Sequence, residues 1–526
     1  MCGLMAVCSR NISLTSFETS FKPLHKRGPD AKCIEVIEDG IMGFYRLAIM
    51  DLSKAGMQPM KLNQSIGICN GEIYNYKELE QQLSSYHFHS GSDCEVLPAL
   101  WEFCRENMFQ MLDGEFALVI YDGKLKQWIA ARDPMGIRPL FYGTLKQDGK
   151  LAFASEMKAL QSLCEEIKPF PSGSYCINGT FVKYHDCASY QQPIKETTLE
   201  AICKGIRTRL ENAVAKRLHS DAPMGFLLSG GLDSSLVCSI AAKQTKEPLR
   251  TFAIGMKKDA IDLRYARIAA DFIGSRHTEF LMDKEEVINV LRELIYQLET
   301  YDITTIRASL GMYLLCKKIH ENTDIKVLMS GEIADELFGY KYTDFAPDAC
   351  SFQKESEKRI RELYMYDVLR ADRCISAHAL EARVPFSDKD LIAYVMSIDP
   401  ELKLNRYGIG KYLLRNAFTD QDLPDIIRMR EKAAFSDAVG HSLVDDVKEY
   451  AEEYYTDQQF QKKCEAYGYA KPFTKESLLY REIFESFYPN RADLIAGFWM
   501  PNQAWPYCNV NDPSARVLQN YGNSGK

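Results

Sequence analysis

The second residue of the chain is a cysteine that could act as a catalytic nucleophile. The sequence opens Met1-Cys2-Gly3, and an initiator methionine that precedes a small residue is commonly removed. Removal leaves Cys2 with a free α-amino group, whose ordinary pKa of about 7.7–8.0 allows it to accept the thiol proton near neutral pH. One residue then supplies both the nucleophile and the base. The alternative, favoured by position alone, is that Cys2 is one of 16 cysteines that happens to lie beside a frayed terminus.

A second feature with chemical potential is the run Asn70-Gly71-Glu72, which follows a strand-like stretch. It offers a side-chain amide next to a backbone N–H. Such a pair suits an oxyanion hole that stabilises the tetrahedral intermediate of amide hydrolysis. Taken alone, Asn-Gly is more often an ordinary turn.

A third feature is the loop Ser229-Gly230-Gly231-Leu232-Asp233-Ser234-Ser235, between a predicted buried strand and a predicted apolar helix. Its glycines and hydroxyl groups let backbone N–H groups and the helix N-terminus surround an anion. The aspartate suits Mg²⁺ bound together with phosphate oxygens. It is not a Walker A loop, because the terminal Gly-Lys-Ser/Thr is missing. A serine–glycine linker is the alternative, but the flanking strand and helix argue against it.

The first third of the chain must position the cysteine and the Asn-Gly pair. Apolar or alternating runs separated by turn residues predict short strands at Gly3–Cys8, Ile41–Met50, Ser65–Cys69, Phe116–Tyr121, Trp128–Arg132 and Leu151–Ala154. Helices are predicted at Tyr76–Leu83 and Cys94–Cys104. This order predicts a mixed α+β domain with packed sheets.

The glycine-rich loop belongs to a part of the chain with a different rhythm. Strands predicted at 225–228, 252–256, 277–282 and 325–329 alternate with helices predicted to start near 234, 262, 283 and 306. Alternation of this kind predicts a parallel sheet with binding sites at the carboxyl ends of its strands. From Glu355 the chain is predicted to be mainly helical.

A polar segment at 191–198, which contains Pro193, separates the two patterns. We therefore expect a first domain over residues 2–190, a second over 199–500 and a tail over 501–526. The tail lacks periodicity, so we expect it to be partly loose.

Composition excludes several classes of function. The hydrophobic content of 46%, net charge of −8 and pI near 5.8 are ordinary for a globular protein and argue against nucleic acid or an anionic membrane as a partner. No CxxC pair or histidine cluster has the spacing of a zinc site. The N-terminus has no signal-peptide pattern and no stretch reaches the roughly 18 apolar residues of a membrane span. We expect a cytoplasmic protein.

The first part of the chain resembles the class II glutamine amidotransferases, whose catalytic domain is an N-terminal-nucleophile hydrolase. The matching motifs are Cys2-Gly3, 26–30 (KRGPD), 45–47 (YRL), 70–72 (NGE) and 91–93 (GSD). By this resemblance, Cys2 attacks the side-chain amide of glutamine, and Asn70 with the Gly71 N–H stabilises the oxyanion. The residues implied for binding glutamine are Arg46, Leu47, Glu72 and Asp93, with Arg46 on the α-carboxylate and the two acids on the α-ammonium.

The loop at 229–235 resembles the pyrophosphatase loop of enzymes that adenylate their substrate. Joined to an amidotransferase, it resembles the asparagine synthetase family along nearly the whole chain. The further matching blocks are 301–309 (YDITTIRAS), 330–336 (SGEIADE), 381–386 (EARVPF), 430–432 (REK) and 435–437 (FSD). The resemblance implies a sandwich of the N-terminal-nucleophile type followed by an α/β parallel-sheet ATP-pyrophosphatase domain.

The resemblance also implies a two-stage reaction. The aspartate side chain attacks the α-phosphorus of ATP to give β-aspartyl-AMP and pyrophosphate, and ammonia from glutamine then displaces AMP to give asparagine. Glutamine, aspartate and ATP are the implied substrates, Mg²⁺ the implied ion, and a homodimer the assembly that the family suggests. Glu332 is the implied base that takes a proton from the attacking ammonia.

The remaining roles are implied in the same way. Residues expected to bind ATP are Leu228, Ser229, Gly231, Asp233, Ser234, Ser235, Ile254, Gly331, Arg370 and Lys432. Asp233 and Asp262 are expected to hold Mg²⁺, and Arg307, Asp335 and Glu336 to bind aspartate. For Arg307 and Arg370 taken singly, a structural salt bridge is an equally good interpretation.

Three rival functions are weighed against this one. A relative that closes a β-lactam or cyclises a peptide would have no need for glutamine hydrolysis, yet Cys2, Arg46, Asn70 and Asp93 are all present. A catalytically silent scaffold predicts decay of at least one site, and no named position is missing. An amidotransferase acting on a sugar phosphate leaves the adenylating loop unexplained.

Overall fold

The computed structural model describes residues 1–189, 194–196, 198–431 and 439–522. The chain forms two compact units. The first contains residues 1–187 with two short segments from later in the sequence, 220–223 and 376–381, and the second contains the rest of the described chain. The predicted boundary at 191–198 falls partly outside the described residues.

The first unit is built on two six-stranded sheets. One has the strand order β10-β8-β9-β1-β3-β2 and the other β12-β11-β7-β6-β5-β4. The strands of the first sheet are β1 (Gly3–Val7), β2 (Ala31–Ile37), β3 (Gly40–Arg46), β8 (Phe141–Leu145), β9 (Leu151–Ala154) and β10 (Cys164–Pro169). Those of the second are β4 (Met60–Leu62), β5 (Ser65–Ile73), β6 (Gly114–Asp122), β7 (Gln127–Arg132), β11 (Ser174–Ile177) and β12 (Thr180–Lys183).

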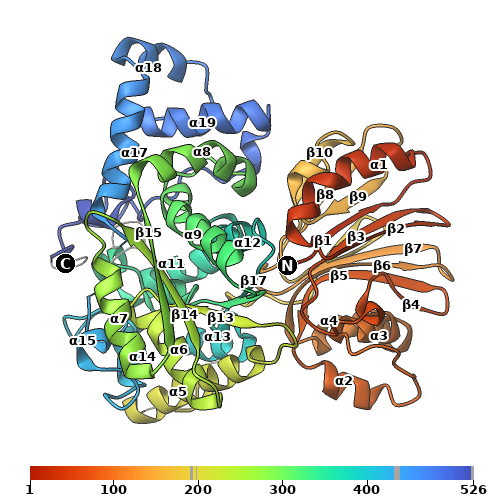
Figure 1. Ribbon diagram of the computed structural model, residues 1–526, viewed down its shortest axis with the longest axis horizontal. Coiled ribbons are helices and arrows are strands. Elements are labelled where there is room, and N and C mark those ends of the chain that lie inside the picture. Colours follow the sequence, from red (N-terminus) through yellow and green to blue (C-terminus); the bar gives the residue numbers. More distant parts are fainter. Residues whose placement is uncertain (190–193, 197, 432–438, 523–526) are drawn as a thin grey trace. The chain divides into compact units, whose positions relative to one another are not determined.

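The two sheets form a sandwich around one apolar core. Leu4 and Phe44 of the first sheet are buried in the same cluster as Ile68 and Val119 of the second. Helix α1 (Leu14–Phe21) covers the outer side of the first sheet, and α2 (Tyr76–Gln82), α3 (Val96–Cys104) and α4 (Met108–Met111) lie beyond the second (Figure 1). The predicted α+β architecture is therefore confirmed.

The second unit contains the predicted parallel sheet, with strand order β15-β14-β13-β16-β17. Its strands are β13 (Met224–Leu227), β14 (Arg250–Met256), β15 (Arg276–Met282), β16 (Val327–Met329) and β17 (Glu381–Arg383). The pairs β13/β14, β14/β15 and β13/β16 are parallel. The helices between them are α6 (Leu232–Gln244), α7 (Ile261–Ile273), α8 (Lys284–Leu298) and α9 (Ile303–Asn322).

The strand order creates a switch point beside β13. From β13 the chain moves one way to β14 and β15, and later returns to the other side as β16. Because such crossovers are right-handed, α6 and α7 cover one face of the sheet and α9 the other. Loops that leave neighbouring strands at a switch point diverge to opposite faces and form a crevice, which is where α/β proteins bind ligands.

Helices make up most of the second unit outside this sheet, as the sequence predicts. They include α5 (Leu199–Arg217), α10 (Ala334–Phe338), α11 (Ala349–Glu362), α12 (Asp367–Ser376), α13 (Lys389–Met396), α17 (His441–Tyr454), α18 (Asp457–Cys464) and α19 (Lys475–Phe487). Helix α8 begins where the sequence predicts a helix to start, near residue 283, and Asp283 and Glu286 form a capping box there. Among the described residues, no helix is both long and apolar enough to cross a membrane.

The tail beyond Pro501 differs from the expectation of a loose segment. Its only regular element among the residues up to 522 is a short 3₁₀ turn (Ala515–Val517). Trp505, Cys508 and Leu518 are nevertheless buried, in one cluster with Tyr342 and Tyr366. Isolated aromatic anchors of this kind leave no periodic signal, so the sequence pattern could not reveal them.

We predict that the sandwich core, rather than its edge strands, controls the stability of the first unit. Phe44 on β3 is fully buried, whereas Val36 on the neighbouring strand β2 is 66% exposed. Phe44→Ala should lower the free energy of unfolding by about 3–5 kcal/mol because it leaves a cavity between the sheets, and Val36→Ala should change it by less than about 0.5 kcal/mol. Calorimetry of the full chain measures both, and equal shifts for the two variants would contradict the assignment of the core.

Candidate active sites

Cys2 lies at the start of β1 with its thiol turned towards the end of β3. The Leu47 backbone N–H donates to Sγ at 3.4 Å, and Sγ lies 3.6 Å from the Leu47 carbonyl oxygen. Burial raises the pKa of the Cys2 thiol to about 11. In the chain that begins at Met1 the thiol is therefore held in its protonated, weakly nucleophilic form.

The α-amine of Met1 is also buried, and it donates to the Leu380 carbonyl at 3.0 Å. Leu380 belongs to the segment 376–381 of the first unit. Burial lowers the pKa of this amine to about 5, so at neutral pH it is an uncharged and weak base. Neither group of the unprocessed terminus has the pKa that proton transfer from the thiol requires. Loss of Met1 would transfer the free amine to Cys2 itself.

Asn70 lies on β5, and its side-chain amide is buried without the usual hydrogen bonds. Its Nδ2 and Oδ1 atoms are both buried and have no hydrogen-bond partner in the described part of the chain. Burying an unpaired amide costs free energy, so a ligand that supplies a partner is favoured. A carbonyl oxygen that becomes negatively charged would accept from Nδ2.

Gly71 must be glycine at this position. Its φ is +154°, and a Cβ would lie 2.1 Å from the Glu115 carbonyl oxygen on the paired strand β6. The backbone N–H beside Asn70 is therefore presented by a conformation that other residues could not adopt. Sequence reasoning predicted this amide and N–H pair, and the structure brings it to the strand of the second sheet that contacts β1.

The residues expected to bind glutamine are largely buried. Arg46 ends β3 and is 6% exposed; its Nη1 donates to the Ser53 carbonyl at 2.6 Å and its Nη2 to the carbonyls of Met50 and Asp51. A substrate carboxylate would therefore have to share this guanidinium with a turn of the backbone. Asp93 accepts from the Ile73 N–H at 2.7 Å.

Glu72 and Leu47 complete this set. Glu72 is 6% exposed and Leu47 is 2% exposed. The Glu72 charge is close enough to Cys2 to raise the pKa of the thiol, after the larger effect of burial. Burial raises the pKa of Tyr76, and the nearby charges of Asp93 and Glu72 add to the effect.

The second unit contains a cavity of about 240 Å³ at the switch point of its sheet. The predicted ATP, metal and aspartate residues that line it are Leu228, Ser229, Gly231, Asp233, Ser234, Ile254, Asp262, Arg307, Gly331, Glu332, Asp335, Glu336 and Arg370. Ser235 does not line the cavity, and its fully buried Oγ has no partner in the described residues. Lys432 lies outside the described residues.

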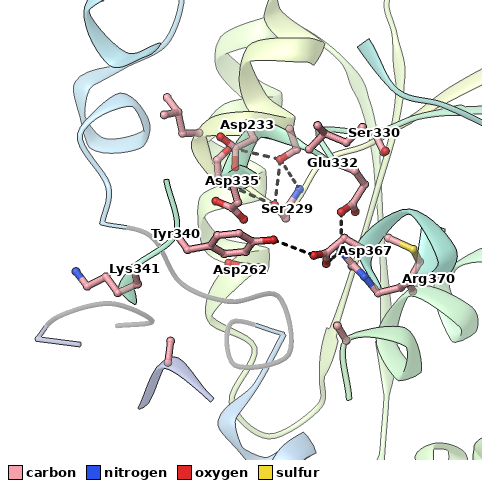
Figure 2. Close-up of a pocket in the computed structure, with 18 of the residues that line it drawn as sticks. Ser229, Asp233, Asp262, Ser330, Glu332, Asp335, Tyr340, Lys341, Asp367 and Arg370 are labelled. Carbon is pink, nitrogen blue, oxygen red and sulfur yellow. Dashed lines mark hydrogen bonds and ion pairs between the residues drawn. The ribbon is translucent and has the colours of Figure 1, made fainter. Parts of the chain in front are cut away.

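The loop between β13 and α6 is shaped by close packing. Gly230 has a φ of +72°, and a Cβ there would lie 2.3 Å from the backbone N of Ala266. Ser229 Oγ and Ser234 Oγ are 3.0 Å apart, and Gly231 N–H donates to Ser229 Oγ at 3.3 Å. The loop thus directs hydroxyl groups and the N-terminus of α6 towards the cavity (Figure 2), as an anion site requires.

Gly331, which follows β16, fixes the distance between the two loops at the switch point. A Cβ on Gly331 would lie 2.7 Å from the backbone N of Ser234. Any larger residue would therefore push the two loops apart. Because of this contact, residues from both segments, 229–235 and 330–336, line the same cavity.

Three acidic residues that line the cavity near the 229–235 loop are each held by a cation. Lys411 Nζ lies 2.7 Å from Asp233 and 2.6 Å from Asp335, and is only 3% exposed. Arg430 Nη2 lies 2.8 Å from Asp262. Sequence reasoning missed Lys411, because it adopts a left-handed conformation (φ +58°) in an irregular segment and belongs to no predicted element.

Asp233 and Asp262 offer a donor set that fits Mg²⁺ bound with a nucleotide. Among the described residues, no cluster of three or more side chains could hold a metal ion by itself. Mg²⁺ usually takes one or two carboxylates and completes its octahedron with substrate phosphates and water. Two carboxylates lining one cavity meet that requirement.

Glu332 is tied to a network on the other side of the cavity. Arg370 Nη2 lies 2.5 Å from Glu332 Oε2 and 3.0 Å from Asp367 Oδ1. Figure 2 shows the Tyr340 hydroxyl directed towards Asp367, at 3.1 Å, while the same oxygen is 2.6 Å from Glu336 Oε1. Neither Tyr340 nor Asp367 was predicted from the sequence. Tyr340 follows Glu336 by four residues, and Asp367 precedes Arg370 by three.

The network around Arg370 contains several carboxyl groups, although it is largely buried. Burial, then the neighbouring charges of Asp367 and Asp335, raise the pKa of Glu336 well above its usual value. Ion pairing with Glu332 and Asp367 raises the pKa of Arg370, against the opposing effect of burial. At this end of the cavity the carboxyl groups of Glu332, Glu336 and Asp367 surround one cation, Arg370, which favours a positively charged ligand group here.

Arg307, expected to bind a carboxylate or phosphate, is held by two carboxylates of the protein. Its Nε and Nη2 donate to Glu476 at 2.8 and 2.5 Å, and its Nη1 and Nη2 donate to Asp512 at 2.9 and 3.1 Å. The structural salt bridge that was an equal interpretation of this residue is thus present. Both forks of the guanidinium are used, so a direct bidentate contact with substrate would require displacement of one acid.

Two family models match the chain and together cover most of it. A glutamine amidotransferase domain matches residues 1–179, and asparagine synthase matches residues 205–351 and 345–512. These matches agree with the predicted order of an N-terminal-nucleophile sandwich and an ATP-pyrophosphatase unit.

Individual relatives match along the whole chain. The glutamine-hydrolysing asparagine synthetase of Homo sapiens is 41% identical and the match covers 100% of both chains. The glutamine-hydrolysing asparagine synthetase 2 of Arabidopsis thaliana is 40% identical over 94% of this chain and 88% of its own. On the strength of both domain matches and the full-length identity, the chain belongs to the family of glutamine-hydrolysing asparagine synthetases.

Proposed function

We propose that this protein makes asparagine from aspartate and ATP, with glutamine as the nitrogen donor. The observation that carries the proposal is that one chain of this family joins two kinds of site. The first unit holds Cys2 and an unpartnered Asn70 amide, and the second holds a cavity lined by the 229–234 loop and by Glu332.

In the first unit, the free amine of processed Cys2 takes the thiol proton, and Sγ attacks the amide carbon of glutamine. The developing oxyanion accepts hydrogen bonds from Asn70 Nδ2 and the Gly71 N–H. Ammonia leaves, and water then releases glutamate from the thioester. Arg46 and Leu47 bind the α-carboxylate side of glutamine, and Glu72 and Asp93 bind its ammonium.

In the second unit, a β-carboxylate oxygen of aspartate attacks the α-phosphorus of ATP and pyrophosphate leaves. The phosphates lie on the loop formed by Ser229, Gly231, Ser234 and Ser235, and Leu228, Ile254 and Gly331 contact the adenosine. Asp233 and Asp262 would hold Mg²⁺, which would supply positive charge to the phosphates. Arg370 and Lys432 offset the charge of the departing pyrophosphate.

The second step of the synthesis needs a base and a cationic subsite. Ammonia attacks the acyl carbon of β-aspartyl-AMP, and Glu332 takes the proton that the attacking nitrogen loses. Asp335 and Glu336 receive the ammonium of aspartate, whose positive charge matches the excess of carboxylates at this end. Arg307 acts here by holding the cavity wall in position, or by donating its remaining N–H to the substrate.

The compartment and the assembly state are part of the proposal. All 16 cysteines are free thiols, which suits a reducing compartment such as the cytoplasm. A homodimer is the assembly proposed from the family resemblance.

The product of ATP cleavage tests the proposed chemistry. Purified protein supplied with aspartate, ATP, Mg²⁺ and either glutamine or ammonium should form asparagine together with AMP and pyrophosphate. Chromatography of the nucleotides and amino acids measures each product. Formation of ADP and phosphate would refute an acyl-adenylate intermediate, and omission of Mg²⁺ should abolish ATP cleavage.

Cys2→Ala separates the two sites. It should abolish glutamine-dependent synthesis, by at least about 10³-fold, because no other thiol can form the thioester, while ammonia-dependent synthesis stays near the parent rate. Cys33→Ala, on the edge strand β2, is the matched control and should leave both rates unchanged. Equal loss of both rates in Cys2→Ala would contradict the division of labour. Protein that retains Met1, identified by its mass, should behave as Cys2→Ala does.

Glu332→Gln tests the proposed base. The change keeps the shape of the side chain but removes its ability to take a proton, so ammonia-dependent and glutamine-dependent kcat should both fall by about 10²–10⁴-fold. Glutamine hydrolysis alone should persist. Glu321→Gln, at the exposed end of α9, is the control. If Glu332→Gln retains full synthesis from ammonia, another group is the base.

A further inference from the structure

The C-terminal segment contributes directly to the cavity of the second unit. Six of its residues line that cavity: Trp499, Pro501, Pro513, Ser514, Ala515 and Leu518. They face the same space as Glu332 and Asp335, although they are separated from them by more than 160 positions in the sequence. The segment 499–521 is therefore part of the cavity wall, and we call it the C-terminal strap.

The first part of the strap is anchored by aromatic packing. Trp499 and Trp505 are buried against Tyr342, with ring centroids 5.7 and 6.0 Å from its ring. The Arg359 guanidinium lies 4.7 Å from the Trp499 ring and donates to the Met500 carbonyl at 2.6 Å. These contacts fix the start of the strap without any regular secondary structure.

The second part of the strap is held mainly by polar contacts on two sides of the cavity. On one side Asp512 pairs with Arg307 of α9 and, at 2.7 Å, with Lys448 of α17. On the other side Asn520 Nδ2 donates to the Lys341 carbonyl at 2.9 Å and to Asp344 at 3.0 Å. Pro513 to Leu518 lie between these two attachments, and four of these residues form part of the cavity wall.

Asp512 and Glu476 hold Arg307 in one orientation. Glu476 takes the Nε and Nη2 edge of the guanidinium and Asp512 takes the Nη1 and Nη2 edge. Four of the five N–H groups of Arg307 are thereby used in the described structure. With Lys448, whose side chain is 40% exposed, the group contains two cations and two anions. The strap thus supplies one of the two acids that hold the buried Arg307 at the cavity wall.

We propose that Asp512 is a positioning residue that seats the C-terminal strap over the cavity, and that the seated strap protects the acyl-adenylate from water. The inference rests on the proposed function, because it concerns the lifetime of β-aspartyl-AMP. If the wall opens, the oxygen of a water molecule attacks the acyl carbon and the bond from that carbon to the phosphate oxygen breaks. Aspartate and AMP result, the protons of the water pass to solvent, and ATP is consumed without asparagine.

The ratio of AMP to asparagine in the ammonia-fed reaction measures this leak. A closed site forms one AMP for each asparagine. Asp512→Asn keeps the size of the side chain but removes the charge that pairs with Arg307 and Lys448, so the strap should lift and the ratio should rise several-fold. Leu518→Ala removes a buried wall residue, 5% exposed, without touching any ion pair, and should raise the ratio in the same direction.

Asp445→Asn is the matched control. Asp445 pairs with Arg516 of the same strap at 3.1 Å, but it is 62% exposed and does not line the cavity. Its ratio should equal that of the parent protein. Glutamine hydrolysis should be unchanged in both Asp445→Asn and Leu518→Ala. The melting temperature should be unchanged in Asp445→Asn; in Leu518→Ala the loss of a buried side chain should lower it, but it should stay above the assay temperature, which distinguishes a leak from general unfolding.

Two outcomes would overturn the inference. The first is a ratio of one in a folded Asp512→Asn protein; should that variant fail to fold, a ratio of one in Leu518→Ala is equally decisive. The second is a rise in Asp445→Asn as large as that in Asp512→Asn. Failure of the parent protein to form asparagine would instead refute the proposed function, so the two failures are distinguishable.

Discussion

The second unit depends on the pairing of charges that are held away from water. An unpaired buried charge costs several kcal/mol even after relaxation, and two of the cations that line the cavity show how this cost is avoided by pairing with anions. Lys411 has Asp233 and Asp335, and Arg430 has Asp262. In these pairs, each of the two cations has at least one carboxylate partner. The pairs also define what can bind, because a ligand must replace each partner that it removes.

Under the proposed function, ATP with Mg²⁺ would meet that condition. Asp233 and Asp262 would hold the metal, and Lys411 and Arg430, which pair with these carboxylates, would then be left to the phosphates, so that negative charge of the protein would be exchanged for negative charge of the nucleotide. The first unit follows a different constraint, in which the buried Asn70 amide has no hydrogen-bond partner in the described part of the chain. In the second unit, charged side chains have partners that a ligand could replace. In the first unit, the Asn70 amide has no such partner in the described part of the chain.

The sequence predicted the architecture because its signals are local. Alternation at Leu151–Ala154 matches β9 residue for residue, and Asp283 with Glu286 caps α8 where the sequence predicts a helix to start. Edge strands such as β10, with the charged sequence CEEIKP, were missed because exposure removes the alternating pattern. Lys411 and Asp512 were missed for a related reason. Their roles follow from long-range pairing in irregular segments, which no periodicity records, and only the folded chain brings them to the cavity.

The case of Arg307 shows how the structure changes the interpretation of a motif. An arginine in a matching block is expected to bind an anionic substrate, yet both of its forks are occupied by Glu476 and Asp512. An arginine whose guanidinium pairs with two carboxylates has few N–H groups left to bind a substrate. Its orientation is well fixed, because it can change only if two ion pairs break together. Because one of those pairs comes from the end of the chain, α9 and the C-terminal strap are joined at the cavity wall. Under the proposal above, Arg307 would thus contribute to the chemistry by helping to exclude water from the cavity rather than by binding a substrate.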